Sequence, residues 1–356
     1  MDYQLSDRIN AIQPSPTLAV TQKANELRQQ GKDVIGLGVG EPDFDTPDFI
    51  KDAAIQAIHD GKTKYTAVDG IDELKDAVIK KLKRDNSLSY QRSEIIVSAG
   101  GKHSIFNLLS AWLNPGDEVV IPAPYWVSYP DMTKLVGATP VIVKAGIDQR
   151  FKITPEQLRN ALTDKTRLMF INSPSNPAGT AYTANELEAL AEVLRDYPNV
   201  LIATDDMYEH LVWSDSPFAN FPMKKMQSQS TSNPASISQY AAAAALNGDQ
   251  SCIKTMVTAF KERHDYLVDA LNSIDGIDCV PGDGTFYAFA QVDKLMAKAN
   301  VSSDVELCEK LLTEANVALV PGSAFGTDGY CRLSFATGMD VLKEAVKRIK
   351  SFSESL

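Results

Sequence analysis

Residues 168–208 have the sequence LMFINSPSNPAGTAYTANELEALAEVLRDYPNVLIATDDMY, in which two short apolar runs flank a helical pattern. The runs Leu168–Ile171 and Val200–Ala203 are rich in aliphatic residues and are expected to be buried strands. Thr183 and Glu186 have the spacing of a capping box, so a helix is expected to begin there. A strand, a helix and a second strand in this order favour two parallel strands joined by a crossover helix.

The alternation of strands and helices continues on both sides of this segment. Other short apolar or β-branched runs are predicted to be strands, at Ile95–Val97, Glu118–Ile121 and Pro140–Val143 before it and at Phe286–Ala290, Val317–Val320 and Cys331–Phe335 after it. Such alternation implies a mostly parallel sheet with helices on both faces. We therefore expect an α/β chain with a large domain over residues 46–265 and a smaller α/β domain formed by the two chain ends, residues 1–45 and 266–356.

Composition excludes several classes of protein. The chain has 356 residues, 44% of them hydrophobic, which is enough for a sizeable core. Its net charge of -11 argues against nucleic acid or an anionic membrane as a partner, because both attract basic surfaces. The N-terminus has no signal-peptide pattern and no apolar run approaches the roughly 18 residues of a membrane span, so we expect a cytoplasmic location. The cysteines form no CxxC pair and the histidines no HxxxH pair, so no metal site is predicted.

Two loops after predicted strands carry groups that suit a phosphate and a planar ring. Gly100, Gly101 and Lys102 open a predicted helix, where free backbone N–H groups can bind a phosphate. Glycine pairs are also common in tight turns, so this motif alone leaves both interpretations open. Trp126 follows another strand and can stack on a ring, although a tryptophan at that place is also typical of a core or rim position.

Four further polar residues lie at strand ends or within a strand. Asn176 belongs to a turn-rich segment after a strand, and Asp205 directly follows another. A carboxylate at that place can keep a pyridinium nitrogen protonated, and the phenol of Tyr208 can donate to an oxygen on the same ring. Arg332 lies within an apolar strand, where it needs either a substrate carboxylate or an internal ion pair. In sheets of this kind, ligands bind at the carboxyl ends of the strands.

Taken together, these motifs resemble the class I/II aminotransferases of fold type I, and specifically the bacterial aspartate or aspartate/prephenate subgroup. The matching pieces follow the family's order over nearly the whole chain: PSPT, GEPDFDTP, GKTKYTAVDGIDEL, SAGGKHSIFNL, GDEVVIPAPYWVSYP, NSPSNPAGT, TDDMYEHL, QSQSTSNP, GTFYAF, VPGSAFG and CRLSFA. The resemblance implies pyridoxal 5'-phosphate as cofactor, an amino acid and a 2-oxo acid as substrates, and a homodimer. The subgroup favours aspartate or another dicarboxylate.

The resemblance also assigns roles to individual positions. Residues implied to bind the cofactor are Tyr65, Gly100, Gly101, Lys102, Trp126, Asn176, Asp205 and Tyr208. Residues implied to bind the substrate are Thr17, Gly40, Lys102, Trp126, Asn176 and Arg332. Tyr65 would reach the cofactor phosphate of a partner subunit, which would make the site a property of the dimer.

One segment departs from the family pattern. Family members carry Ser/Thr-x-x-Lys and then Gly-Trp-Arg-x-Gly-Tyr before the Gln-Ser-Gln-Ser-Thr motif, and that lysine forms the Schiff base with the cofactor. Here the lysine is expected roughly 30 residues after Tyr208, where Ser236–Ser238 stand instead. Lys224 and Lys225 correspond to surface lysines of the family. No catalytic residue is therefore assigned, and the cofactor is expected to bind non-covalently at best.

The chain is also roughly 40 residues shorter than is usual in the family, which indicates a block missing near residues 221–223. We expect this block to contain two strands of the large-domain sheet. Three interpretations remain open: an aminotransferase impaired by the deletion or shortened by a gene-model or cloning event; a non-catalytic protein that binds the cofactor or pairs with an intact subunit; and an active enzyme that uses another lysine, such as Lys102.

Overall fold

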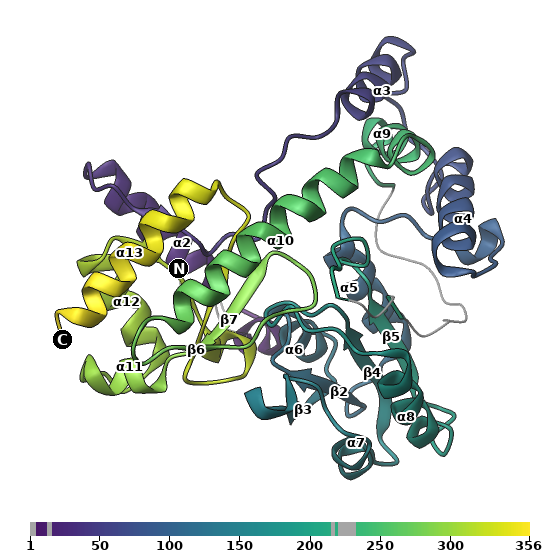
Figure 1. Ribbon diagram of the computed structural model, residues 1–356. Helices are drawn as coiled ribbons and strands as arrows, with labels where there is room; N and C mark the ends of the chain where they lie inside the picture. Colours follow the sequence, from purple (N-terminus) through teal and green to yellow (C-terminus); the bar gives the residue numbers. More distant parts are fainter. Residues whose placement is uncertain (1–4, 13–15, 215–217, 220–232) are drawn as a thin grey trace. The chain divides into compact units, whose positions relative to one another are not determined.

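The computed structural model describes residues 5–12, 16–214, 218–219 and 233–356, and for residues 16–19 it describes only the helix to which they belong. The described chain is α/β, as predicted (Figure 1). It forms two compact units, the first made of Met1–Asp43, Gly116–Phe221 and Thr255–Leu356, and the second of Phe44–Pro115 and Pro222–Lys254. In this grouping the parallel sheet belongs to the same unit as both chain ends, and residues 44–115 belong to the other unit. The predicted domains, 46–265 and 1–45 with 266–356, stay a prediction.

The first unit contains a four-stranded parallel sheet with strand order β3-β2-β4-β5. Its elements are, in chain order, β2 (Glu118–Ala123), α6 (Ser128–Leu135), β3 (Thr139–Lys144), η2 (Ile147–Gln149), α7 (Pro155–Ala161), β4 (Thr166–Asn172), α8 (Ala184–Leu194) and β5 (Leu201–Asp205). The capping box that the sequence predicts for α8 is present, with Thr183 accepting a hydrogen bond from the N–H of Glu186. The sheet thus forms from the segment whose alternation predicted it.

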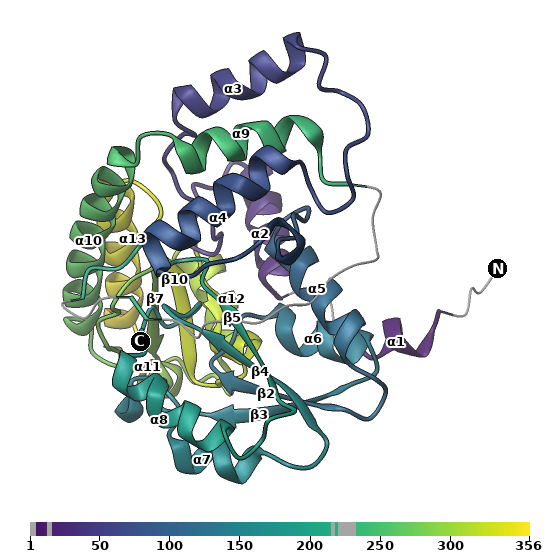
Figure 2. The same cartoon turned by 90° about the vertical axis from the view of Figure 1, so that its right-hand side faces the viewer.

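Successive residues of β4 face opposite sides of this sheet, as expected for a strand. Met169 and Ile171 pack into an apolar cluster with residues of α7 and α8. Phe170 lies between them and faces the other side, where its ring stacks on that of Tyr129 from α6 at 4.3 Å. Helices therefore cover both faces of the sheet (Figure 2).

The rest of the first unit is built from the chain ends. Its strands form an antiparallel sheet of order β6-β7-β10-β9 and a parallel β1-β8 pair. The elements are α1 (Asp7–Asn10), α2 (Pro16–Gln29), β1 (Ile35–Gly36), β6 (Asp278–Cys279), β7 (Tyr287–Gln291), α11 (Asp293–Lys298), α12 (Asp304–Glu314), β8 (Val317–Ala318), β9 (Val320–Pro321), η3 (Gly322–Phe325), β10 (Tyr330–Ser334) and α13 (Met339–Glu354). Helix α10 (Ser251–Asn272) begins in the second unit and continues into the first.

The second unit is helical. It contains α3 (Asp48–His59), α4 (Asp72–Asn86), η1 (Arg92–Glu94), α5 (Gly101–Trp112) and α9 (Ser236–Asn247), and α9 packs against both α3 and α4. The prediction of a strand at Ile95–Val97 is wrong, because this segment forms no strand. The N–H of Val97 instead donates to the carbonyl of Asp69 at 3.1 Å. A strand needs a neighbour to receive its backbone hydrogen bonds, and none pairs with this run within the described residues.

None of the helices described is both long enough and apolar enough to cross a bilayer. Residues 221–223, where the sequence predicts the missing block, lie outside the described residues, as do Lys224 and Lys225.

Candidate functional site

At the carboxyl ends of β4 and β5, Asn172 links two predicted site residues, Asn176 and Asp205. Asn172 and Asp205 are register partners in the parallel ladder, and the side-chain amide of Asn172 donates to the carbonyl of Asp205 at 2.7 Å. The same side chain accepts a hydrogen bond from the N–H of Asn176 at 2.8 Å. Asn172 therefore ties the turn that carries Asn176 to the strand end that carries Asp205.

The carboxylate of Asp205 is partly buried and receives a hydrogen bond from the phenol of Tyr129 at 2.6 Å. Burial raises the pKa of Asp205, while hydrogen bonds from Tyr129 and from the backbone N–H of Met207 oppose that rise. The Tyr129 side chain is only 2% exposed, and burial beside this acid raises the pKa of Tyr129 well above its usual value. Tyr129 is thus the hydrogen-bond donor of this pair, and Asp205 is the acceptor.

Trp126 lies in the loop between β2 and α6, close to this pair. Its ring meets that of Tyr129 edge-on, with centroids 5.4 Å apart. The backbone N–H of its neighbour Tyr125 donates to the carbonyl of Phe325 at 3.1 Å, which connects this loop to η3. In the first unit, Tyr129 therefore contacts both the predicted ring-stacking residue, Trp126, and the predicted partner of the ring nitrogen, Asp205.

Arg332 is, after Asp205, the second predicted site residue whose charged group is at least partly buried. It is 4% exposed, and its guanidinium donates to the side-chain oxygen of Asn176 at 3.0 Å and to the carbonyl of Gly38 at 2.6 Å. Its Nε atom has no hydrogen-bond partner, and in the part of the chain that the structure describes no acidic side chain pairs with it. Burial lowers the pKa of Arg332. A buried cation without a counter-ion has the chemistry of a subsite for an anionic ligand.

Tyr287 connects Arg332 to Tyr208. The guanidinium of Arg332 lies over the ring of Tyr287, 4.4 Å from its centroid, and the Tyr208 and Tyr287 hydroxyls are 3.3 Å apart. A second ring, Phe325, lies 4.9 Å from the same guanidinium. Gly40 approaches the Tyr287 hydroxyl so closely that a side chain at position 40 would overlap it. Six of the predicted positions in this unit, including Gly40, thus belong to one connected group.

Four of the remaining predicted positions belong to the second unit, and the fifth, Thr17, belongs to the first. In the second unit Gly100 adopts a φ of 89° immediately before α5, and Gly101 and Lys102 are the first residues of that helix. Tyr65 is 89% exposed in the same unit. Thr17 belongs to α2, and its side chain lies outside the description.

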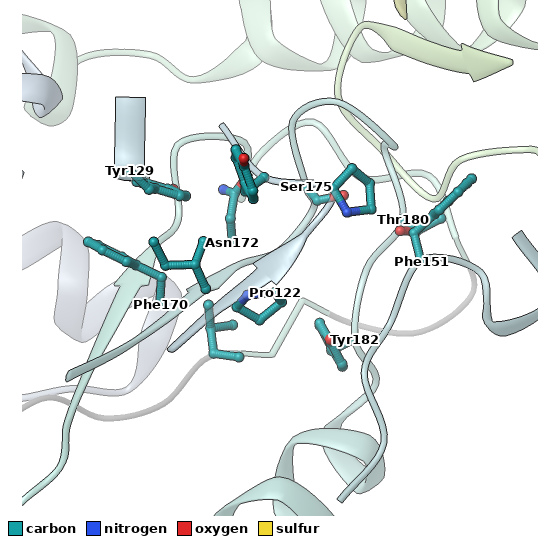
Figure 3. A pocket seen from close by; sticks show the side chains of 12 residues that line it. Pro122, Tyr129, Phe151, Phe170, Asn172, Ser175, Thr180 and Tyr182 are labelled. Atoms are coloured by element: carbon teal, nitrogen blue, oxygen red, sulfur yellow. The ribbon is translucent and has the colours of Figure 1, made fainter. Parts of the chain in front are cut away.

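Two cavities lie in the first unit. A cavity of about 20 Å³ is lined by Tyr129, Phe170, Asn172, Ser175 and Tyr182, among others (Figure 3). It is far too small for a cofactor, because ligand pockets typically measure hundreds of Å³.

The other cavity, of about 340 Å³, is lined by residues that include Arg150, Lys152 and Asp283, and by no predicted site residue. Arg150 pairs with Asp283, and Lys152 pairs with Glu186, so both cations already have anionic partners.

The sequence did not single out Tyr129, Asn172, Tyr287 or Phe325. Tyr129 and Tyr287 lie inside the quoted motifs GDEVVIPAPYWVSYP and GTFYAF, which was the one available signal. Their contacts join segments 76 and 79 residues apart in the chain. Local pattern alone does not reveal such pairings.

Comparison with known proteins identifies the class. The family model for aminotransferase class I and II matches residues 32–222 and 221–349, so the chain belongs to this family. Its fold is that of the type I aminotransferases, which use pyridoxal 5'-phosphate.

The chain is similar to an aspartate/prephenate aminotransferase of Nitrosomonas europaea, with 52% identity over 393 residues that cover 98% of this chain and 99% of the relative. Among solved structures, it is similar to the aspartate aminotransferase from Rhizobium meliloti, with a TM-score of 0.93, 40% identity and 99% coverage of both chains. It is also similar to the aspartate aminotransferase from Thermus thermophilus with maleate, with a TM-score of 0.91, 36% identity and full coverage of both chains.

The side chains present fit this cofactor in part. Asp205 offers a partly buried carboxylate with no cationic side chain paired to it among the described residues, which suits a protonated ring nitrogen. The unpartnered Nε of Arg332 suits a substrate carboxylate. The only lysines in the sequence between Tyr208 and Gln227 are Lys224 and Lys225.

Proposed function

We propose that this chain is an aminotransferase by descent that keeps side chains for the cofactor ring and the substrate carboxylate but lacks the lysine that anchors the cofactor. The observation that carries this proposal is the sequence between Tyr208 and Lys254, whose only lysines are Lys224 and Lys225. An intact enzyme uses its lysine both as a nucleophile and as a base. Transamination is therefore expected to be far slower than in an intact relative.

Several observations support a missing block. The two segments matched by the family model meet at residues 221–222. The alignment with the Nitrosomonas relative runs over 393 residues, whereas this chain has 356, so at least 37 positions of that alignment face a gap in this chain. In the first unit β5 pairs only with β4 among the described residues. In the second, residues 95–97 form no strand. Two missing strands account for both features, because each would have lost its neighbour.

The retained residues have definite tasks. Pyridoxal phosphate, when bound, supplies an electron sink for amino-group transfer. Asp205 would hold the proton on the ring nitrogen, and Tyr208 and Asn176 would donate to the ring oxygen. Trp126 would stack on the ring, and Arg332 would bind the substrate α-carboxylate. The glycines and Lys102 at the start of α5 would hold the phosphate.

The test is an absorbance spectrum of the purified protein with added pyridoxal phosphate, followed by borohydride reduction and peptide mapping. We expect no reducible covalent link to any lysine and no transamination above that of free cofactor. A labelled lysine peptide, from Lys102 or elsewhere, together with turnover near that of an intact relative, would refute the proposal.

The substrate we propose is aspartate or another dicarboxylic amino acid, with a 2-oxo acid as acceptor, in the cytoplasm. The supporting observation is the similarity to relatives named aspartate/prephenate and aspartate aminotransferases. Equilibrium binding of maleate in the presence of cofactor tests this. Maleate should bind more tightly than a monocarboxylate of similar size, and Arg332→Lys should weaken it by about 2 kcal/mol because lysine cannot form two parallel hydrogen bonds.

The missing strands also predict low stability. Buried strands that lose their neighbours leave backbone groups unpaired and apolar surface exposed. We expect a low melting temperature or aggregation. Calorimetry and light scattering test this, and a cooperative melt at high temperature from a monodisperse dimer would contradict it.

A second candidate function is pairing with an intact subunit. Tyr65 is 89% exposed, and apolar side chains of the same unit are exposed as well, among them Ile55 (51%), Ile58 (51%) and Val68 (53%). These exposed side chains support a dimer in which Tyr65 completes the neighbour's phosphate site. The test is co-expression with an intact relative in which the equivalent tyrosine is replaced by phenylalanine. The chain should raise the activity of that relative, and its Tyr65→Phe variant should not.

A further inference from the structure

Tyr129 is held in one orientation by contacts on several sides. Its ring stacks on Phe170 with an interplanar angle of 9° and meets Trp126 edge-on at 81°. Its N–H donates to the carbonyl of Trp126 at 3.0 Å, and its carbonyl accepts the hydroxyl of Thr133 at 2.8 Å. Figure 3 shows the ring lying over Phe170. A phenol fixed in this way has its hydroxyl placed before any ligand arrives.

Asp205 depends on this hydroxyl. The groups that act on its carboxylate are the phenol of Tyr129 and the backbone N–H of Met207, and neither carries a positive charge. The neighbouring titratable groups, Asp206 and Tyr208, are acids as well. In the described residues no lysine, arginine or histidine pairs with Asp205. Where a partly buried carboxylate has no cation beside it, hydrogen bonds from neutral donors favour its ionised form against the effect of burial.

We propose that Tyr129 is a positioning residue of the cofactor site, whose hydroxyl donates to one carboxylate oxygen of Asp205 and so keeps that group ionised and oriented toward a protonated ring nitrogen. The inference rests on the proposed cofactor-binding function. Tyr129 acts through Asp205 and touches neither the substrate nor the reacting atoms.

The alternative is that Tyr129 is only a packing residue. A packing role depends on the ring, whereas the proposed role depends on the hydroxyl, so Tyr129→Phe separates the two. The matched control is Tyr182→Phe. Tyr182 lines the same cavity, is also buried, and loses a hydroxyl that accepts the N–H of Ile153 at 2.9 Å, but that hydroxyl does not contact Asp205.

The first measurement needs no cofactor. Protein labelled with 13C at the aspartate side-chain carboxyl is titrated by NMR, and the Asp205 signal is identified by its loss in Asp205→Asn. Tyr129→Phe is expected to move the Asp205 titration to higher pH, while Tyr182→Phe leaves it in place. An unchanged Asp205 titration in Tyr129→Phe would overturn the proposal.

The second measurement follows the 15N chemical shift of the ring nitrogen in labelled pyridoxamine phosphate, which binds without a lysine. The unaltered protein should keep this nitrogen protonated at pH 8. Tyr129→Phe should lose the proton at lower pH and bind about tenfold more weakly, the loss expected for one hydrogen bond to a charged group. Equal ring protonation in both proteins would refute the role of Tyr129. Failure of the unaltered protein to bind this compound would instead refute the proposed cofactor site, and the carboxylate titration would still decide on Tyr129.

Discussion

Asp304 is expected to determine the stability of the loop that packs against Arg332. Its side chain is 2% exposed at the start of α12, and it accepts hydrogen bonds from the N–H of Ser323 at 2.9 Å, the hydroxyl of Ser323 at 2.8 Å and the N–H of Gly329 at 3.1 Å. The loop between these two donors carries Phe325, whose ring contacts the Arg332 guanidinium. Asp304 thus fixes the loop that carries Phe325, although Asp304 itself is not one of the predicted site residues.

Asp304→Ala removes three hydrogen bonds to a charged acceptor and leaves two backbone N–H groups without a partner. At about 1.5 kcal/mol or more for each such bond, the expected loss of unfolding free energy is about 3–5 kcal/mol. Asp304→Asn keeps one acceptor oxygen and should lose about half as much. The control is Asp340→Ala, which removes an exposed acid from the first turn of α13 and should cost less than about 1 kcal/mol.

Urea unfolding followed by circular dichroism and by tryptophan fluorescence measures the midpoints of all four proteins. Amide exchange at Ser323 and Gly329 reports on the loop itself, and both amides should exchange faster in Asp304→Ala. A midpoint for Asp304→Ala that equals that of Asp340→Ala would refute the reasoning.

Three further predictions follow from the site and its surroundings. Because burial raises the pKa of Asp205, its ionisation costs folding free energy as pH rises through its titration, so Asp205→Asn should raise the melting temperature at pH 7 and leave it unchanged at pH 3, measured by calorimetry. Tyr287→Phe loses only the contact with Tyr208 and should change maleate affinity less than threefold, whereas Tyr287→Ala also removes the ring beneath Arg332 and should weaken maleate by tenfold or more in calorimetric titration. Of the four cysteines, Cys252 is half-buried and the other three are buried, so a disulfide reagent should modify Cys252 rapidly in the native protein and the other three only after unfolding.

The sequence predicted most of the elements that position the site. Local signals were sufficient for the strands β2, β4 and β5 and for α8, because their residues have the period and the caps of these structures. The segment Val34–Val39, an apolar run, forms only the two-residue strand β1. Residues 95–97 have strand composition but form no strand, since β structure depends on a neighbour that local composition does not specify.

The site was predicted less completely for a related reason. Asp205, Tyr208 and Arg332 were singled out as candidates because a charged or phenolic group after or within an apolar strand is unusual. Tyr129 and Tyr287 are aromatic residues in apolar surroundings, and nothing in their local sequence separates a packing role from a hydrogen-bonding one. Their roles depend on which side chains the fold brings to their hydroxyls.

The missing block that we propose would give a physical reason for the division of the chain into two compact units. A parallel sheet holds distant segments together through its ladder of hydrogen bonds, and each internal strand is needed by both of its neighbours. In the described residues the ladder ends at β5, and the β-branched run at 95–97 belongs to the other unit without forming a strand. If two strands are absent from the sheet, the sheet loses its continuity and the chain loses its lysine. One event would then impair both the chemistry and the cohesion of the predicted large domain, whereas a point substitution of the lysine would impair only the chemistry.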